Sequence, residues 1–195
     1  MLQRENFEWC NTWIEYANNT DKERILLIGD SISVGYRPFV NTFMEDYYVD
    51  LLGTSRSIND PVYKTEITTA IEQYDYKKIH FNNGLHGWHL SKEEYEDGMR
   101  KMLDFIKTIA PKAQLFIATL TPVTKIDHTD TLDVTNNDVL DRNEVVIRLA
   151  KEYDLILDDL YSVVIGKSEY RQDDGYHYND DGKIAEAKAI AEILK

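Results

Sequence analysis

Short apolar runs alternate with longer amphipathic segments along this chain, and this alternation constrains its fold more than any other feature of the sequence. The apolar runs are short and contain few polar residues, as expected of strands that are buried on both faces of a sheet. Strands that alternate with helices form a parallel sheet covered by helices. We therefore predict an α/β fold with parallel strands at residues 24–28, 47–52, 78–81, 115–119 and 155–157.

Amphipathic segments with a helical period lie around these strands. The clearest covers residues 92–109, because Ser91 and Glu94 form a capping box before it and Pro111 ends it. The last helix has Asn179 as its predicted N-cap. The predicted helices cover residues 6–18, 33–46, 61–74, 92–109, 137–153 and 180–194.

Length, charge and cysteine content narrow the class of protein. The 195 residues lead us to expect a single domain over residues 1–195. The 22 Lys and Arg against 35 Asp and Glu give a net charge of −13, which argues against a nucleic-acid partner.

No apolar run approaches the ~20 residues of a membrane span. Cys10 is alone, so neither an intrachain disulfide nor a cysteine cluster for a metal is expected. The first residues lack the pattern of a secretory signal, and we expect a cytoplasmic protein.

The loops that follow the strands are where a ligand is expected, because open α/β sheets bind ligands beyond the carboxyl ends of their strands. Two of the predicted loops, residues 120–136 and 158–178, are unusually long, and long loops are often functional.

Two of these loops contain residues that could form a nucleophile and its base. Gly29, Asp30 and Ser31 follow the first strand, where a serine hydroxyl lies at the mouth of the sheet near free backbone N–H groups. The alternative is an ordinary helix cap, since Asp and Ser are favoured there. Asp174 and His177 precede the last helix and could supply a base with its orienting partner. The alternative is a polar surface loop with an unrelated histidine.

Two further loops could stabilise an oxyanion. Asn83 ends the third strand region, and an asparagine amide donates hydrogen bonds without charge. The alternative is turn chemistry, because Asn83 is followed by Gly84. The stretch from Gly53 to Arg56 could offer a backbone N–H, or could be an ordinary loop.

Together and in this order, these blocks resemble the SGNH (GDSL-type) hydrolase family over essentially the whole chain. In that family the serine of the Gly-Asp-Ser block is the nucleophile, which implies this role for Ser31. The Asp-x-x-His block implies that His177 is the base and that Asp174 orients it. The Asn of a Gly-x-Asn block lines the oxyanion hole, which implies this role for Asn83, although Phe81 stands where the family has glycine. The resemblance implies a three-layer, flavodoxin-like sandwich with a five-stranded parallel sheet and helices on both faces, and no cofactor or metal.

The second block of the family carries a glycine whose backbone N–H completes the oxyanion hole. Counted from the strand without gaps, that position is Arg56, and Gly53 is the alternative. Any residue other than proline has this N–H, so the expected donors are the N–H groups of Ser31 and Arg56 and the amide of Asn83. The Arg56 side chain would also bring a cation near the site, which could favour an anionic or polyhydroxyl substrate.

The implied function is a serine esterase that works through an acyl-enzyme. We expect a short-acyl (acetyl) ester on a carbohydrate, or another small-molecule ester, with His86, Trp88 and Arg37 as candidate substrate-binding residues. His86 and His89 could instead suggest a metal pair, but no third ligand is evident. The alternatives are a lysophospholipase or thioesterase of the same family and a non-catalytic carbohydrate-binding module. A flavin or nucleotide binder would need a glycine-rich phosphate loop, which the sequence lacks.

Overall fold

The computed structural model describes residues 2–195 and is built around a six-stranded sheet with the order β1-β3-β2-β4-β5-β8. The five predicted strands are all present and run parallel to one another, as expected. The strands of this sheet are β1 (Cys10–Trp13), β2 (Glu23–Gly29), β3 (Tyr47–Thr54), β4 (Tyr76–Phe81), β5 (Gln114–Ala118) and β8 (Ile156–Asp158).

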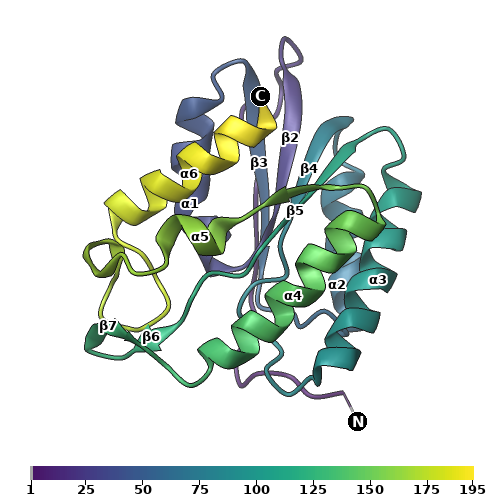
Figure 1. Ribbon diagram of the computed structural model, residues 1–195. Helices are drawn as coiled ribbons and strands as arrows, with labels where there is room; N and C mark the ends of the chain where they lie inside the picture. The colour runs from purple at the N-terminus through teal and green to yellow at the C-terminus, as the bar shows by residue number, and fades with distance from the viewer. Residues whose placement is uncertain (1) are drawn as a thin grey trace.

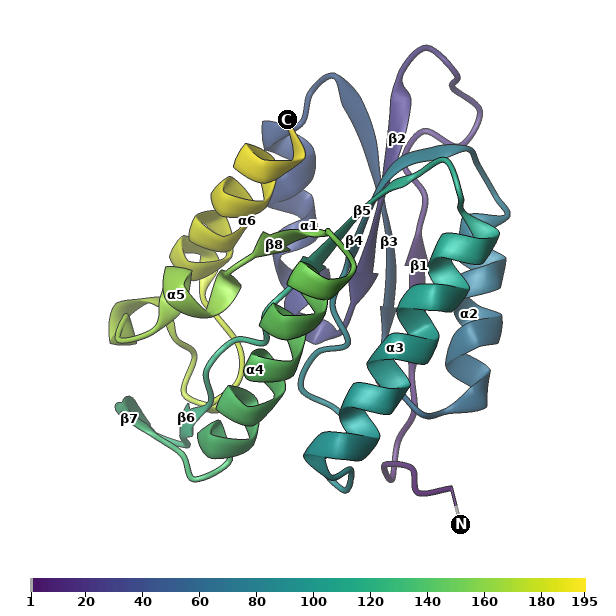
Figure 2. The same cartoon turned by 45° about the vertical axis from the view of Figure 1, so that its right-hand side comes forward.

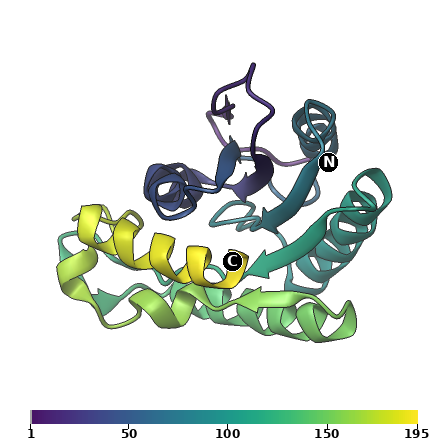
Figure 3. The same cartoon turned by 90° about the horizontal axis from the view of Figure 1, so that it is seen from above.

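The helices form layers on both faces of the sheet. Helices α1 and α6 pack together on one face, and α2, α3 and α4 cover the other (Figures 1 and 2). Figure 3 shows the same arrangement from above, with the sheet between α6 and α3. The helices are α1 (Ser31–Phe43), α2 (Pro61–Ile71), α3 (Lys92–Ile109), α4 (Asn136–Glu152), α5 (Leu160–Val164) and α6 (Asp180–Leu194). The structure thus has the predicted three-layer α/β architecture, but its sheet has six strands rather than the predicted five, because β1 adds an antiparallel strand at one edge.

The structure contradicts the helix predicted over residues 6–18. Residues Cys10–Trp13 form β1 instead, which pairs antiparallel with the outer edge of β3. Phe7 and Trp13 suggested the apolar side of a helix, but their side chains are 85% and 48% exposed and lie outside the core. The open edge of β3 supplies backbone hydrogen-bond partners, and these outweigh the local helical pattern.

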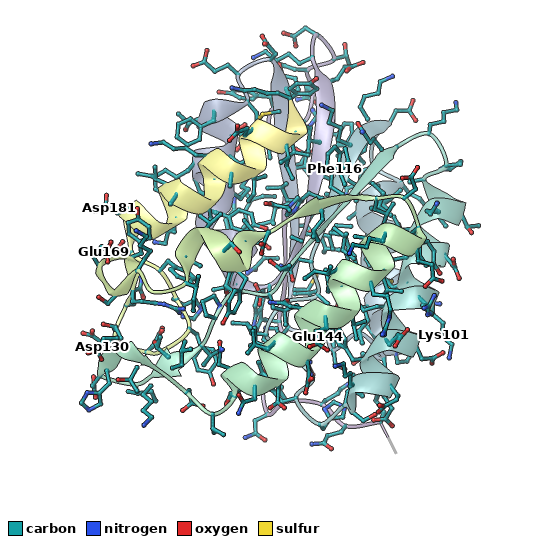
Figure 4. All side chains as sticks on the ribbon, in the orientation of Figure 1. Lys101, Phe116, Asp130, Glu144, Glu169 and Asp181 are labelled. Atoms are coloured by element: carbon teal, nitrogen blue, oxygen red, sulfur yellow. The ribbon has the colours of Figure 1, made fainter. Side chains whose placement is uncertain are left out.

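The core lies between the sheet and its two helix layers. Residues Ile25–Ile28 of β2 are fully buried, which explains their continuous apolar pattern. Figure 4 shows Phe116 inside the molecule, whereas Asp130, Glu144 and Asp181 project from its outer surface. Among residues 2–195, no helix has both the length and the apolar character that crossing a bilayer requires.

The two long predicted loops contain additional elements. The first holds a two-stranded hairpin of β6 (Thr124–Lys125) and β7 (His128–Leu132). The second holds α5 and the 3₁₀-helix η1 (Ser168–Tyr170).

Strand β2 lies between β3 and β4 in the sheet. After β2 the chain forms β3 on one side of it, and it then crosses over to form β4 on the other side. This is the flavodoxin-like strand order, in which the switch point lies at the carboxyl ends of the two strands that here are β2 and β4. The loops after these two strands therefore border the expected ligand site.

Candidate active site

The turn after β2 places Ser31 at the start of α1. Asp30 is the N-cap of this helix, and its carboxylate accepts a hydrogen bond of 2.9 Å from the backbone N–H of Ile32. The other oxygen of the same carboxylate accepts from the N–H of Leu85, at 2.8 Å. The cap function predicted as an alternative therefore belongs to Asp30 and leaves the hydroxyl of Ser31 free. As the first residue of the helix, Ser31 also has an N–H without an intrahelical partner.

Ser31, His177 and Asp174 form one hydrogen-bonded chain, although 146 residues separate the first two in sequence. The Nε2 atom of His177 lies 2.8 Å from Oγ of Ser31, and its Nδ1 atom lies 2.6 Å from Oδ2 of Asp174. Ser31 and His177 are half-buried, so the hydroxyl can be reached from solvent. The structure thus brings together the three residues that were predicted to share a site.

The carboxylate of Asp174 is held in its charged form. Burial alone would raise its pKa, but hydrogen bonds from the backbone and side chain of His177 and the backbone of Tyr176 outweigh burial. The two backbone N–H groups each donate to Oδ1 at 2.8 Å. The pKa of Asp174 is therefore lowered, and its second oxygen is free to accept from His177.

The β6–β7 hairpin supports the loop that carries Asp174. The N–H of Thr124 donates to the carbonyl of Gly175 at 2.9 Å, and the N–H of Asp127 donates to the carbonyl of Asp173 at the same distance. Gly175 has a φ of +83°, and a Cβ at this position would overlap the carbonyl oxygen of Thr124. The β6–β7 hairpin and the loop at Gly175 thus pack closely against each other.

Asn82 and Asn83 fasten the loop after β4 to the loops on either side. The Asn83 amide donates to the carbonyl of Arg56 at 3.1 Å, and the Asn82 amide donates to the carbonyl of Thr119 at 3.1 Å. The Oδ1 atom of Asn83 is buried and has no hydrogen-bond partner within residues 2–195. An amide carries two N–H groups, and the bond to Arg56 uses one of those of Asn83, which is 2% exposed.

The side chain of Arg56 does not act as a free cation. It pairs with three carboxylates at 3.0–3.6 Å, which come from Glu66, Asp60 and Glu8. The prediction that this cation would favour an anionic substrate is therefore not supported, because its charge is already balanced.

The backbone positions of Arg56 and Gly53 also differ. The N–H of Arg56, in the loop after β3, donates to Oγ1 of Thr54, the last residue of that strand, at 3.3 Å. Gly53 was predicted to begin this loop but lies within β3, where it is paired with Gly29 on one side and Asn11 on the other. Backbone N–H groups of a strand that is paired on both sides are used by the sheet, so Gly53 is unsuited as a donor to a ligand. Arg56 lies in the loop, and its N–H must be shared with Thr54 if it is also to donate to an oxyanion.

One of the three predicted substrate-binding residues is misplaced. Arg37 is buried and donates to the carbonyl of Val49, at 3.1 and 3.0 Å, and pairs with Glu15. Val49 lies near the start of β3, away from the carboxyl ends of the strands, so Arg37 fastens α1 to the sheet. His86 and Trp88 do lie in the loop after β4, as predicted.

The histidines do not assemble a metal site. His80 is buried and hydrogen-bonded to Asp158 at 2.9 Å, and His86 pairs with Glu5 at 2.7 Å. Within residues 2–195, no three His, Cys, Asp or Glu side chains are grouped so that they could hold a metal ion.

Sequence reasoning missed Glu186 on α6. It lines a recess of about 220 Å³ together with Ser31 and His177, yet it is 0% exposed and neither carboxyl oxygen has a partner within the described residues. Burial, followed by the nearby carboxylate of Asp30, raises its pKa well above the usual value, and this favours its protonated form. A sequence signal existed: positions 182, 186, 190 and 194 are four apart and form one buried stripe of α6.

Comparison with known proteins gives one curated relative and many solved structures. No family model matches the chain. The GDSL esterase/lipase WDL1 of Oryza sativa subsp. japonica is 27% identical over 128 residues, which cover 58% of this chain. The match covers 47% of the rice protein, so the chain aligns with less than half of that relative.

The solved structures share the fold over most of their length. A GDSL-like lipase from Bacteroides thetaiotaomicron matches with a TM-score of 0.71 and 13% identity, over 91% of this chain and 92% of that one. Est24, a carbohydrate acetylesterase from Sinorhizobium meliloti, matches with a TM-score of 0.72 and 15% identity, over 89% and 98%. The acetyl xylan esterase AlAXEase matches with a TM-score of 0.71 and 16% identity, over 88% and 100%. At these identities the likeness establishes a common fold.

Proposed function

We propose that the chain is an SGNH (GDSL-type) hydrolase and acts as a serine esterase with Ser31, His177 and Asp174 as its catalytic triad. The observation that carries the proposal is the unbroken hydrogen-bonded chain of 2.8 and 2.6 Å through these side chains. It supplies a nucleophile, a base and a group that fixes the tautomer of the base. The proposed mechanism uses no metal or organic cofactor.

The reaction proceeds in two halves. Oγ of Ser31 attacks the ester carbonyl carbon while Nε2 of His177 takes the hydroxyl proton. The resulting oxyanion is stabilised by the N–H of Ser31, the amide of Asn83 and the N–H of Arg56. His177 then returns the proton to the leaving alcohol, and the acyl group stays on Ser31. In the second half, water attacks the acyl carbon while His177 takes its proton. The bond between the acyl carbon and Oγ of Ser31 then breaks, His177 returns the proton to Oγ, and the acid leaves. Asp174 remains ionised throughout and stabilises the imidazolium.

The proposed substrate is a short-acyl ester, with acetyl as the acyl group and a carbohydrate as the alcohol. Two structural relatives are described as a carbohydrate acetylesterase and an acetyl xylan esterase, which supports this choice. The recess of about 220 Å³ beside Ser31 also favours a small acyl group. It is smaller than the ~300–1,000 Å³ of pockets that hold drug-sized ligands.

Kinetics on a panel of esters test the proposal. Wild type should hydrolyse p-nitrophenyl acetate faster than the octanoate and should release acetate from acetylated xylan. Ser31→Ala should lower kcat/KM by more than about 10³-fold, because the nucleophile is lost. The matched control is Ser168→Ala, an exposed serine of η1, which should leave kcat/KM unchanged.

Three outcomes would contradict the proposal at different levels. Activity that survives in Ser31→Ala would contradict the mechanism. Preference for octanoate would contradict the short acyl group and favour a lysophospholipase or thioesterase. An absence of turnover, with a sugar that raises the melting temperature, would favour a non-catalytic carbohydrate-binding module.

A further inference from the structure

A second and larger recess, of about 500 Å³, lies near the carboxyl ends of the strands. The N-terminal segment forms one wall, and the loops after β3 and β4 form the other. Figure 1 shows the N-terminal segment passing beneath the lower end of the sheet, toward which β2 points. The lining residues are 3–8, Ser55, Ser57 and 87–89.

This recess is adjacent to the proposed reacting centre. Arg56 lies between the two serines that line it, and the amide of Asn83 joins that loop to the loop after β4 at 3.1 Å. The recess is therefore walled by the two loops that carry the proposed oxyanion donors Arg56 and Asn83.

The charged side chains on the walls already have partners. Arg4 donates to both oxygens of Asp60, at 2.7 and 3.2 Å. Glu5 is hydrogen-bonded to His86 at 2.7 Å, and Glu8 accepts at 2.7 Å from a serine hydroxyl in the loop after β3. These contacts hold the N-terminal segment in place and balance much of its charge. A charged ligand would have to displace one of these partners.

The remaining groups suit an uncharged ligand with many hydroxyls. Gln3, Asn6 and His89 line the recess and are exposed, which leaves their amides and imidazole available for hydrogen bonds. Trp88 is half-buried on the same wall, and Arg142 stacks on its ring at 4.4 Å from the centroid. The guanidinium of Arg142 also donates to the backbone carbonyls of residues 86 and 87, which holds the tryptophan loop in place.

We propose that this recess binds the alcohol part of the ester and that this part is a neutral sugar residue. The inference rests on the proposed esterase function. Sugar hydroxyls pair with amide and imidazole groups, and the C–H face of a sugar ring packs on an indole. An anionic alcohol is disfavoured by the net charge of −13. An alkyl alcohol could contact Phe7, which is exposed on the same wall, but it would desolvate the surrounding polar groups without giving them partners. Each recess then binds one part of the ester. The acyl group lies in the small recess beside Ser31, and the sugar lies in the large recess.

The test compares a sugar ester with an ester that has no sugar. In Trp88→Ala, kcat/KM for an acetylated xylo-oligosaccharide should fall about tenfold or more relative to kcat/KM for p-nitrophenyl acetate, as expected for loss of an aromatic contact. His89→Ala changes an exposed side chain and should lower the same ratio in a protein with wild-type stability. The matched control is Trp13→Ala on β1, which is outside the recess and should leave the ratio unchanged.

Binding gives a second readout that does not depend on turnover. Ser31→Ala should bind the acetylated xylo-oligosaccharide in calorimetry, and adding Trp88→Ala or His89→Ala should weaken the Kd about tenfold. If wild type cleaves p-nitrophenyl acetate but neither variant changes the ratio or the Kd, the sugar site is wrong and the esterase proposal stands. If wild type cleaves no ester, the esterase proposal fails, and sugar binding that needs Trp88 and His89 still supports the recess.

Discussion

The carboxylate of Asp30 accepts a hydrogen bond from the backbone N–H of Leu85, which lies 55 residues further along the chain. The same carboxylate caps α1, so one buried side chain connects the turn that carries Ser31 to the loop that carries Asn83. Gly84 lies against it with a φ of +72°, and a Cβ there would overlap the carboxylate. The proposed nucleophile and the proposed oxyanion donor are therefore positioned by the same carboxylate.

Replacement of Asp30 should destabilise the protein. Asp30→Ala leaves two buried N–H groups without an acceptor, and the free energy of unfolding should fall by about 1–3 kcal/mol. Urea denaturation measures the change. The matched control is Asp181→Ala, an exposed aspartate in the first turn of α6, which should shift stability by no more than about 0.5 kcal/mol. Equal losses in the free energy of unfolding of the two variants would show that the buried carboxylate of Asp30 stabilises the fold no more than an exposed one does.

Gly175 should be needed for catalysis as well as for stability. Gly175→Ala strains a φ of +83° and drives a methyl group into the Thr124 carbonyl, so the loop of Asp174 must move. We expect a loss of about 1–3 kcal/mol in stability and a clear fall in kcat. Gly166→Ala is the control, since Gly166 has a φ of +72° but open space around it. Gly166→Ala should lose stability through backbone strain but should keep the wild-type kcat. Thermal denaturation and ester kinetics distinguish the two, and wild-type kcat in Gly175→Ala would refute the support role of the hairpin.

Asn83 should affect turnover more than substrate binding. Asn83→Ala removes an oxyanion donor, and such a loss typically lowers kcat by ~10²–10³. KM for p-nitrophenyl acetate should change little, because the charge on oxygen develops only in the transition state. Steady-state kinetics separate the two parameters. A rise in KM at constant kcat would assign Asn83 to ground-state binding instead.

Glu186 should make stability depend on pH. Its pKa is raised in the folded state, so the folded protein holds a proton that the unfolded chain releases above its ordinary pKa of 4.5. The stability contribution is fully present below that pKa and is lost as pH rises toward the folded-state pKa. Each pH unit between the two values lowers the free energy of unfolding by about 1.4 kcal/mol.

Glu186→Gln removes this titration. Relative to wild type, its stability should rise from pH 4 to pH 8, as measured by urea denaturation at each pH. The control is Glu192→Gln, an exposed glutamate of the same helix, which should follow the wild-type curve. A constant difference between Glu186→Gln and wild type across this range would mean that Glu186 titrates normally.

Local patterns predicted most of the fold. The capping box at Ser91 and the end before Pro111 predicted α3 with the bounds that the structure shows, Lys92–Ile109. The apolar run at residues 25–28 predicted β2, because a strand buried on both faces has no need of polar positions. These features depend on residues that are close in sequence, so the sequence alone carries them.

The errors arose where a distant partner overrides the local pattern. Residues Cys10–Trp13 became a strand because β3 has an open edge, which no local pattern reveals. Arg37 follows Ser31 closely in sequence, but its position on α1 directs it to Val49. The charge of Arg56 looked available because its three acidic partners are scattered over residues 8, 60 and 66.

The sequence by itself determined the five parallel strands, most of the helices around them and the residue types at the ends of the strands, because periodicity, capping and turn chemistry are local properties. Tertiary structure alone decided that the side chains of Ser31 and His177 come within 2.8 Å of each other, and that the N-terminal segment and the loops after β3 and β4 enclose a recess. Such contacts join segments far apart in the chain, and they depend on how the sheet aligns its carboxyl ends and on which edge is left open.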